Sequence, residues 1–551
     1  AIDDAILDFK LSGIGLEAEK QKRYGEIATR LSELSSKFSN NVLDATMAWT
    51  KLVTDVDELK GMPESALTAA KARAAAKNKE GYLFTLDMPS YLPVMMYCDN
   101  RSLREEMYRA YATRASHQAP NAAQWDNSQV MEEILALRFE LANLLGFKNY
   151  AEESLATKMA QTPQQVIDFL NDLAKRAHPQ GERELNTLRE FARQSGASLL
   201  EPWDIAYYSE KQKQHLFTIN DEELRPYFPE NRVLTGLFEV VKRVFGITAK
   251  ERKDVDTWHK DVRFFELYDS NNELRGSFYL DLYAREHKRG GAWMDDCVSS
   301  LRLADGHLQK PVAYLTCNFN GPIDGQPALF THNEVTTLFH EFGHGLHHML
   351  TKIDVAGVSG INGVPWDAVE LPSQFLENWC WQPEALAFIS GHYVTHEPLP
   401  QSMLDRMLSA KNYQAAMFIL RQLEFGLFDF RLHTEYDPAK GGRVMEILQD
   451  VRKQVAVVPA PTWGRFPHAF SHIFAGGYAA GYYSYLWAEV LAADAFSRFE
   501  EEGIFNPQAG KSFLNEILSQ GVSDEPINLF KNFRGREPKL DALLHQYGIQ
   551  G

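Results

Sequence analysis

The sequence predicts a mostly α-helical protein with one small β-sheet. Two stretches, residues 24–42 and 130–145, repeat apolar side chains at three- and four-residue steps, which places one apolar face along each helix. Short aromatic-rich runs at 262–268 and 277–283 flank the polar segment DSNNELRG and predict a β-hairpin, and residues 311–318 supply a third candidate strand. Helical patterns then resume to the end of the chain, so the sheet is a minor part of the fold.

Proline and glycine mark the ends of these elements and one domain boundary. Gly146 directly follows the second helical stretch, at a position where glycine commonly ends a helix. The motif RPYFPE at residues 225–230 interrupts the helical pattern, so we expect a boundary there. The sequence thus predicts a helical domain over residues 1–225 and a catalytic domain over residues 226–551, some of whose later helices can pack on the first. Because the chain opens on Ala within a helical pattern, we expect a further segment before it.

The composition excludes several classes of protein. The chain has 551 residues, 44% of them hydrophobic, which is enough for a large core and for more than one domain. Its formal net charge of −17 opposes contact with nucleic acid or anionic lipid, and no basic patch offsets it. The four cysteines show no CxxC spacing, as expected of reduced thiols. No signal-peptide pattern is present, so we expect a cytoplasmic protein. We also expect a monomer without a nucleic-acid or membrane partner.

The strongest chemical signal is HEFGH, which spans His340 to His344. The two histidines are four residues apart, so on a helix they project from one face and can bind one cation, with Glu341 between them. Thr331 and Glu334 form the S/T-x-x-E pattern of a capping box, which predicts the start of that helix. The motif can also arise by chance among 17 histidines, so two core histidines on a buried helix remain the alternative.

A third metal ligand is expected from the segment WDAVELPSQFLENW. Glu370 and Glu377 lie two helical turns apart in it and face one direction. The apolar neighbours of Glu370 indicate burial, and a buried carboxylate needs a cation or a hydrogen-bond donor. For Glu377, an exposed polar face and a role in orienting a ligand are equally open. Two histidines and one glutamate leave a fourth tetrahedral position for water, the arrangement of a catalytic zinc site, and Glu341 would accept the proton of that water.

Groups that could stabilise a developing oxyanion lie in HAFSHIFAGGYAAGYYSYLW. His472 is followed there by Tyr478, Tyr482 and Tyr485 after a glycine pair. A tyrosine stripe of this kind more often belongs to a core than to an active site. His468 and His472 share the i,i+4 spacing of a metal pair, but no acidic residue adjoins His468, which disfavours a second metal site.

Together these motifs resemble those of the thimet oligopeptidase family of zinc peptidases. The resemblance runs from YLDLYAREHKRGGAW through HEFGH, VELPSQFLENW and HIFAGGYAAGYYSYLW to FRGREP, and it covers essentially the whole chain. It implies that His340, His344 and Glu370 bind one Zn²⁺ per chain and that Glu341 is the general base, in agreement with the spacing. It also implies two largely helical halves that flank a deep substrate channel, with the small sheet beside the HExxH helix.

The same resemblance implies further site residues. Tyr478 and Tyr485 would donate hydrogen bonds to the tetrahedral intermediate, and His472 would act as a neighbouring polarising group. The glycine-rich stretch 475–481 would be a flexible loop beside the metal, so Tyr485 would reach its partner only after closure. The upstream strands would offer an edge on which an extended peptide pairs through its main chain.

We therefore predict a zinc-dependent endopeptidase that hydrolyses short unfolded oligopeptides. The nearest alternative is a dipeptidyl carboxypeptidase of the same family, which needs a cation to grip the C-terminal carboxylate of its substrate; Arg465, Arg534 and Arg536 are the candidates. The other alternative is a catalytically inactive helical scaffold that binds peptides, although such a scaffold has no use for Glu341 beside two imidazoles. Cobalt or manganese could replace zinc, because histidine and carboxylate accept several divalent ions.

Overall fold

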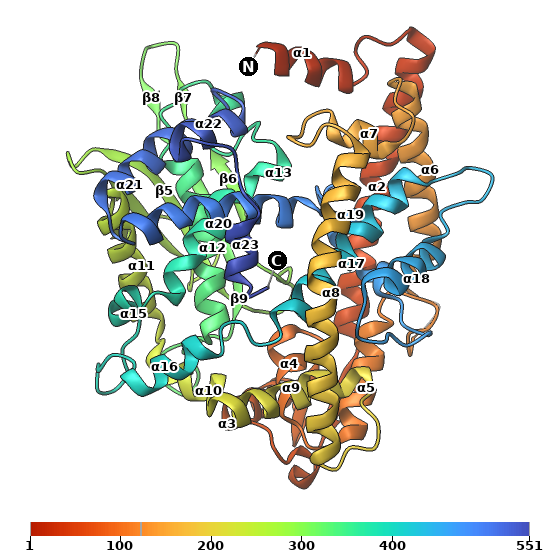
Figure 1. Ribbon diagram of the computed structural model, residues 1–551, viewed down its shortest axis with the longest axis vertical. Helices are drawn as coiled ribbons and strands as arrows, with labels where there is room; N and C mark the ends of the chain where they lie inside the picture. Colours follow the sequence, from red (N-terminus) through yellow and green to blue (C-terminus); the bar gives the residue numbers. More distant parts are fainter. Residues whose placement is uncertain (1, 122–123, 550–551) are drawn as a thin grey trace. The chain divides into compact units, whose positions relative to one another are not determined.

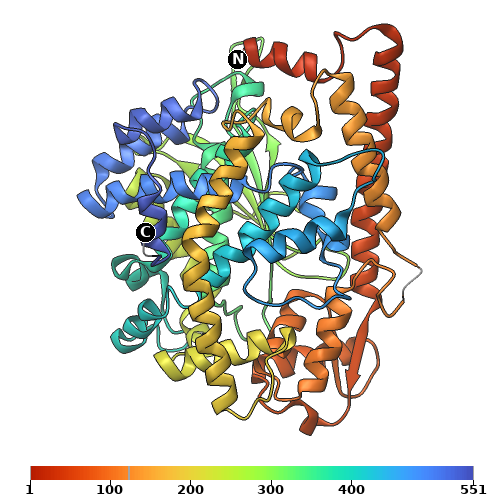
Figure 2. The ribbon, with the colours of Figure 1, turned by 45° about the vertical axis from the view of Figure 1, so that its right-hand side comes forward.

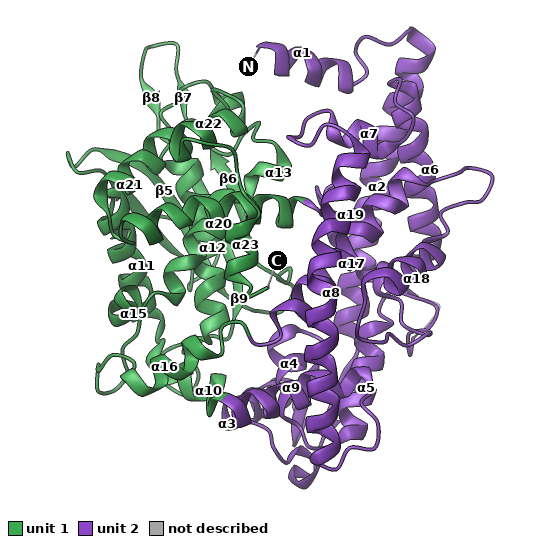
Figure 3. Cartoon of the chain, in the orientation of Figure 1, with its two compact units in different colours: residues 1, 217–412, 484–551 green, residues 2–216, 413–483 purple. Residues whose placement is uncertain are grey.

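Two compact units make up the computed structural model, which describes residues 2–121 and 124–549 (Figure 3). Unit 1 comprises Phe217–Asn412 and the described residues from Ser484 onward, and unit 2 comprises Ile2–Leu216 and Tyr413–Tyr483. Helices dominate both units, and the described strands form three small sheets. The predicted fold class, mostly α with a small sheet beside the HExxH helix, is confirmed.

Unit 2 is built around long helices that bury one face each. α2 (Ala18–Ala48) packs against α6 (Ser128–Leu144), so the two predicted apolar stripes are core seams, and Gly146 follows α6 with a left-handed φ of +92°. α8 (Pro163–Gln194) lies beside α17 (Ala415–Thr434) in both views (Figures 1 and 2).

The remaining elements of unit 2 are shorter, and η denotes a short 3₁₀ or π turn. β1 and β2 form an antiparallel pair that the sequence did not predict. These elements are α1 (Ile2–Leu11), β1 (Thr50–Val53), η1 (Val56–Leu59), α3 (Glu64–Ala76), β2 (Tyr82–Thr85), α4 (Met88–Tyr97), α5 (Arg101–Ala112), α7 (Tyr150–Leu155), α9 (Pro202–Phe217), α18 (Val444–Val455), η5 (Phe466–Ala469) and α19 (Ser471–Phe474).

Unit 1 contains a five-stranded sheet in the order β3-β4-β5-β9-β6. The predicted hairpin is β4 (Arg263–Tyr268) and β5 (Leu274–Tyr283), and the third predicted strand is β9 (Val312–Phe319), which runs parallel to β5. The sequence did not predict the two edge strands, β3 (Thr248–Arg252) and β6 (Trp293–Val298). β3 pairs antiparallel with β4, and β6 pairs antiparallel with β9. Neither edge strand is buried on both faces, so the segments TAKER and WMDDCV carry charged residues. These residues hide the apolar pattern by which a strand is predicted.

The helix α12 (His332–Met349) packs across strands β5, β6 and β9 of this sheet. Phe342 meets Phe278 of β5 edge to face, with ring centroids 5.3 Å apart. On its other side, α12 packs against α14 (Leu371–Glu377), and α14 packs against α20 (Ser484–Glu502). The HExxH helix is therefore enclosed between a sheet and a helical layer.

The other elements of unit 1 surround this arrangement. None of the helices within the described residues is long and apolar enough to span a membrane. The elements are α10 (Asp221–Leu224), η2 (Arg225–Tyr227), α11 (Glu230–Phe245), β7 (Leu301–Arg302), β8 (Leu308–Gln309), η3 (Ala356–Val358), α13 (Trp366–Val369), η4 (Asn378–Trp381), α15 (Pro383–Ile389), α16 (Gln401–Ser409), α21 (Pro507–Phe513), η6 (Leu514–Leu518), α22 (Pro526–Arg534) and α23 (Asp541–Gln546).

A buried ion-pair network ties the turn after β5 to the centre of the sheet. Asp281 accepts hydrogen bonds from Arg285 (2.8 Å), Lys288 (2.9 Å) and the indole of Trp258 (3.0 Å). Lys288 also donates to the carbonyl of Cys317 on β9. Burial alone would raise the pKa of Asp281, but its three hydrogen-bond donors lower it to about 2.

We expect Asp281→Asn to lower the free energy of unfolding by about 2 kcal/mol at pH 7, because the two cations lose their ionised partner. The folded-state pKa lies below the ordinary value of 3.8, so this stabilisation is present above about pH 4 and is lost as the pH falls toward 2. Urea unfolding at pH 7, 5 and 3.5 gives the free energy of unfolding of each protein. The difference between wild type and Asp281→Asn should be smallest at pH 3.5. Asp305→Asn, at an exposed turn, is the control, and a difference that does not change with pH would contradict the assignment.

Candidate metal centre

The helix that carries HEFGH begins where the sequence predicts. The Thr331 hydroxyl accepts a hydrogen bond from the Glu334 N–H (3.1 Å), and the Glu334 carboxylate accepts one from the Thr331 N–H (3.0 Å). This capping box satisfies amide groups that the helix itself leaves unpaired. Arg225 donates to the same carboxylate (3.3 Å), so the start of α12 is anchored on two sides.

The three side chains predicted to bind a metal meet in unit 1. The Nε2 atoms of His340 and His344 each lie 3.1 Å from Oε2 of Glu370. The two imidazole centroids are 5.0 Å apart, and the rings are inclined by 84°. Zinc bound tetrahedrally at about 2.0–2.1 Å holds its ligand atoms roughly 3.3 Å apart. The observed spacing therefore fits one zinc ion held by the three side chains.

Glu370 reaches the histidines because α14 approaches α12 closely at a glycine. Glu370 lies between α13 and α14, and Pro372 stands in the first turn of α14. A Cβ atom on Gly343 would lie 2.5 Å from the Pro372 carbonyl oxygen and 2.6 Å from Cα of Ser373. Any side chain at Gly343 would push the two helices apart. The glycine of HEFGH thus sets the distance between Glu370 and the imidazoles.

The Glu370 carboxylate is buried and ionised. Only 3% of Glu370 is exposed, and the Ser373 hydroxyl donates a hydrogen bond to its Oε2 (3.0 Å). Burial alone would raise the pKa of Glu370, but His344 and His340 lower it well below the ordinary carboxyl value. Glu370 is therefore in the protonation state that binds a metal.

Glu377 orients the first histidine. Its Oε1 lies 2.6 Å from Nδ1 of His340, whose Nε2 faces Glu370. A carboxylate at this position fixes the tautomer of the imidazole and strengthens the other nitrogen as a ligand. The Nδ1 of His344 has no hydrogen-bond partner among the described residues. Of the two roles that the sequence left open for Glu377, the contact with His340 favours orientation.

Glu341 is buried beside the two imidazoles. It is 4% exposed, and its Oε2 has no hydrogen-bond partner within the described residues. Burial raises the pKa of Glu341 above the ordinary carboxyl value. A buried carboxylate oxygen that no protein group occupies is suited to accept a proton during a reaction.

The two histidines that follow HEFGH do not belong to this group of ligands. His348 is fully buried, and its Nε2 lies 3.0 Å from the Val298 carbonyl and 3.1 Å from Oδ1 of Asp296, so it joins α12 to β6. His347 is also buried, and burial lowers its pKa to about 3. It is therefore neutral at pH 7.

The predicted oxyanion donors divide between the two units. Tyr485 lies in the first turn of α20 in unit 1, and its carbonyl accepts a hydrogen bond from Gln374 of α14 (2.9 Å). His472 and Tyr478 lie in unit 2, where their ring centroids are 6.0 Å apart. The assignment of these three residues to the reaction stays a prediction.

An aspartate that the sequence analysis missed anchors the glycine-rich segment 475–481. Asp429 on α17 is fully buried and accepts hydrogen bonds from the backbone N–H groups of Ala480 (2.8 Å), Gly481 (2.9 Å) and Tyr482 (2.9 Å). The segment is therefore fixed at its C-terminal end. The one signal in the sequence was a charged residue inside the apolar helical run EFGLFDF.

Comparison with known proteins reveals relatives along most of the chain. The family described as Peptidase family M3 matches residues 94–549. Oligopeptidase A of Escherichia coli strain K12 is 77% identical over 552 residues, which cover 100% of this chain and 81% of the relative. Dipeptidyl carboxypeptidase of the same strain is 33% identical over 546 residues, covering 98% of this chain and 79% of the relative. The solved structure of PZ peptidase A with inhibitor 2 covers 97% of this chain and 77% of its own, with a TM-score of 0.61 at 14% identity.

The chain belongs to peptidase family M3. With the His340–His344–Glu370 group on and beside its HExxH helix, it is a zinc metallopeptidase. The resemblance to zinc peptidases that the motifs indicated is thereby confirmed, and the 14% identical structure adds that the fold is shared.

We expect Gly343→Ala to weaken zinc binding at least about tenfold and to destabilise the protein by about 1–3 kcal/mol, because the new methyl group collides with the backbone of α14. Competition with a fluorescent chelator would give the zinc affinity, and urea unfolding the stability. Gly25→Ala is the matched control, since an added Cβ there meets nothing within 4 Å on an exposed face of α2. Wild-type zinc affinity in Gly343→Ala would contradict this account.

Proposed function

We propose that this peptidase is an oligopeptidase that cleaves short, unfolded peptides at internal bonds. The observation that carries the proposal is the set of three ligand atoms around one point, with the buried Glu341 next to His340 in the same helix turn. The highly identical relative named oligopeptidase A supports the same class of substrate.

The chain's own residues divide the chemistry among them. His340, His344 and Glu370 would hold the zinc ion, which when bound polarises a carbonyl and lowers the pKa of water toward about 7. Glu341 accepts the proton of the attacking water and passes it to the departing amine. Its raised pKa suits this task, because a stronger base accepts the proton of the attacking water more readily, and a general base works best when its pKa approaches the working pH.

The developing negative charge needs hydrogen-bond donors, and we assign Tyr485 and Tyr478 to this task with His472 as a neighbouring polarising group. The backbone of Tyr485 is held by Gln374 on the helix that follows Glu370, which supports a fixed position relative to the metal. Tyr478 and His472 share one short segment of unit 2.

The edge strand β6 offers a way to bind extended peptides. It is the outermost strand on one side of the five-stranded sheet, and α12 packs against it. A peptide that adds to this edge is recognised through its main chain. Because main-chain pairing does not depend on side chains, a peptidase that binds substrates in this way can cleave peptides of many sequences.

We further propose that residues 1–225 form a helical domain and residues 226–551 the catalytic domain, with some later helices of the second packed on the first. We also propose that the protein acts as a cytoplasmic monomer without a nucleic-acid or membrane partner. The net charge of −17 supports the absence of anionic partners. All four cysteines are free, which agrees with a reducing compartment.

Dipeptidyl carboxypeptidase activity is the second candidate function. It requires a free cation near the metal, for which Arg465, Arg534 and Arg536 are the candidates. Arg536 donates two hydrogen bonds to the Asp494 carboxylate (2.6 and 2.7 Å), and Arg534 donates to the Asp494 backbone carbonyl and to the Glu501 carboxylate. Two of the three cations considered for gripping a substrate carboxylate are thus engaged within unit 1. This favours cleavage at internal bonds.

Glu341→Gln should lower kcat by about 10²–10⁴-fold, because an amide cannot accept the proton of the attacking water. Hydrolysis of a quenched fluorogenic peptide gives the rate. Mass spectrometry of the bound metal should show that Glu341→Gln holds as much zinc as wild type. Glu384→Gln, exposed on α15, is the control. Unchanged turnover in Glu341→Gln, or wild-type hydrolysis that persists after zinc is chelated, would contradict the mechanism.

A peptide amidated at its C-terminus should be cleaved within about twofold of the rate of the free acid, since internal cleavage needs no grip on the terminal carboxylate. Mass spectrometry of the products from one defined peptide of about ten residues would locate the cut bonds. Loss of cleavage on amidation, with dipeptides released from the free acid, would establish the exopeptidase instead.

A further inference from the structure

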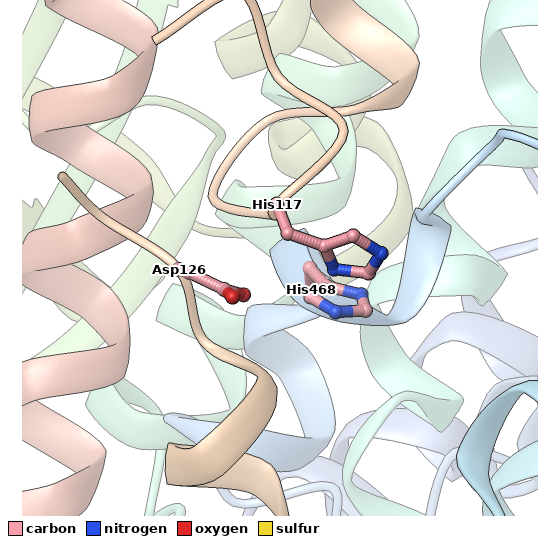
Figure 4. A group of neighbouring side chains, drawn as sticks. All are labelled: His117, Asp126 and His468. Carbon is pink, nitrogen blue, oxygen red and sulfur yellow. The ribbon is translucent and has the colours of Figure 1, made fainter. Parts of the chain in front are cut away.

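A second group of metal-binding side chains lies in unit 2. His117, Asp126 and His468 each offer one ligand atom, and these atoms all lie within 4.8 Å of one another (Figure 4). His117 and Asp126 belong to the segment between α5 and α6, and His468 belongs to η5. Figure 4 shows the Asp126 carboxylate directed toward the two imidazole rings, whose centroids are 6.1 Å apart.

His468 is the buried member of the group, with 3% of its surface exposed. Its Nε2 lies 2.9 Å from Oγ of Ser128, and its Nδ1 has no hydrogen-bond partner among the described residues. A buried imidazole nitrogen left in this way is unfavourable unless a donor or a cation completes it.

The Asp126 carboxylate is held in place but not neutralised. Its Oδ1 accepts hydrogen bonds from the Ser128 N–H (2.9 Å) and hydroxyl (2.7 Å), which fix it at the start of α6. Within the described residues, no lysine or arginine forms an ion pair with Asp126. Asn127 donates to the His468 carbonyl (3.0 Å), so the backbones of the two segments are already joined.

We propose that His117, Asp126 and His468 bind a second divalent metal ion, for which zinc has the best-matched chemistry. Two imidazoles and one carboxylate form a donor set that zinc accepts. His117 is exposed, so solvent can supply the remaining coordination position. The sequence disfavoured a second site because no acidic residue adjoins His468; the fold supplies the acid from Asp126 instead, and His117 in place of His472.

An ion at this position would cross-link segments that are far apart in the sequence. It would join the connection between α5 and α6 to η5, directly before the stretch that carries His472 and Tyr478. Because the three side chains meet only in the folded unit, the ion binds the folded state and not the unfolded one, and its binding free energy stabilises the fold. We therefore assign this ion a structural role.

The test is the number of zinc ions bound per chain, measured by mass spectrometry after dialysis against buffered free zinc. Wild type should hold two ions, while His117→Asn and Asp126→Asn should each hold one. His344→Ala should also hold one, because it loses only the ion of unit 1. Asp126→Asn keeps an oxygen that can cap α6, and His117 is exposed, so both variants are expected to fold.

A matched control and a second readout complete the design. His215→Asn removes another exposed histidine of unit 2 and should leave two ions bound. Added zinc should raise the thermal unfolding midpoint of His344→Ala but not that of the double variant His117→Asn, His344→Ala. One ion in wild type that His344→Ala removes, or two ions that survive both His117→Asn and Asp126→Asn, would overturn the proposal.

Discussion

The metal centre depends on the ionised carboxylate of Glu370. A buried carboxylate without a compensating charge costs several kcal/mol, and this one is 3% exposed with both imidazoles directed at a single oxygen. Protonated histidines can compensate it alone, whereas a divalent ion does so with both rings neutral. Ser373 and Glu377 complete the surroundings, so the ligands are positioned by hydrogen bonds of the protein itself.

Close packing on both sides of α12 keeps this arrangement rigid. Gly343 lets the backbone of α14 approach the helix, and Gly345 lets β9 approach it, since a Cβ on Gly345 would lie 3.2 Å from Leu315. His348 adds a polar link to β6 through Val298. The helix can therefore move little relative to the sheet or to Glu370. Such preorganisation matters because ligands and base must be placed to within about 0.5 Å to act together.

The parts that the sequence predicted correctly depend on short-range rules. The capping box of Thr331, the spacing of His340 and His344, and the pairing of β4 with β5 are each set within a few residues. Glu370 was found because the helical period and its apolar neighbours placed one carboxylate on a buried face. The edge strands, the contacts of Asp429 and the His117–Asp126–His468 group were missed, because each depends on contacts that no local pattern encodes.

The two metal groups show the same distinction in chemical terms. In unit 1 the ligands come from one helix and the turn just before the helix packed on it, so the sequence alone reveals the donor set. In unit 2 a turn and a distant connection supply the ligands, and the site exists only once that unit has folded. Zinc would then be linked to two different properties, turnover in one unit and stability in the other. Because a chelator removes both ions, loss of activity on chelation reports on both, and only variants of single ligands can separate them.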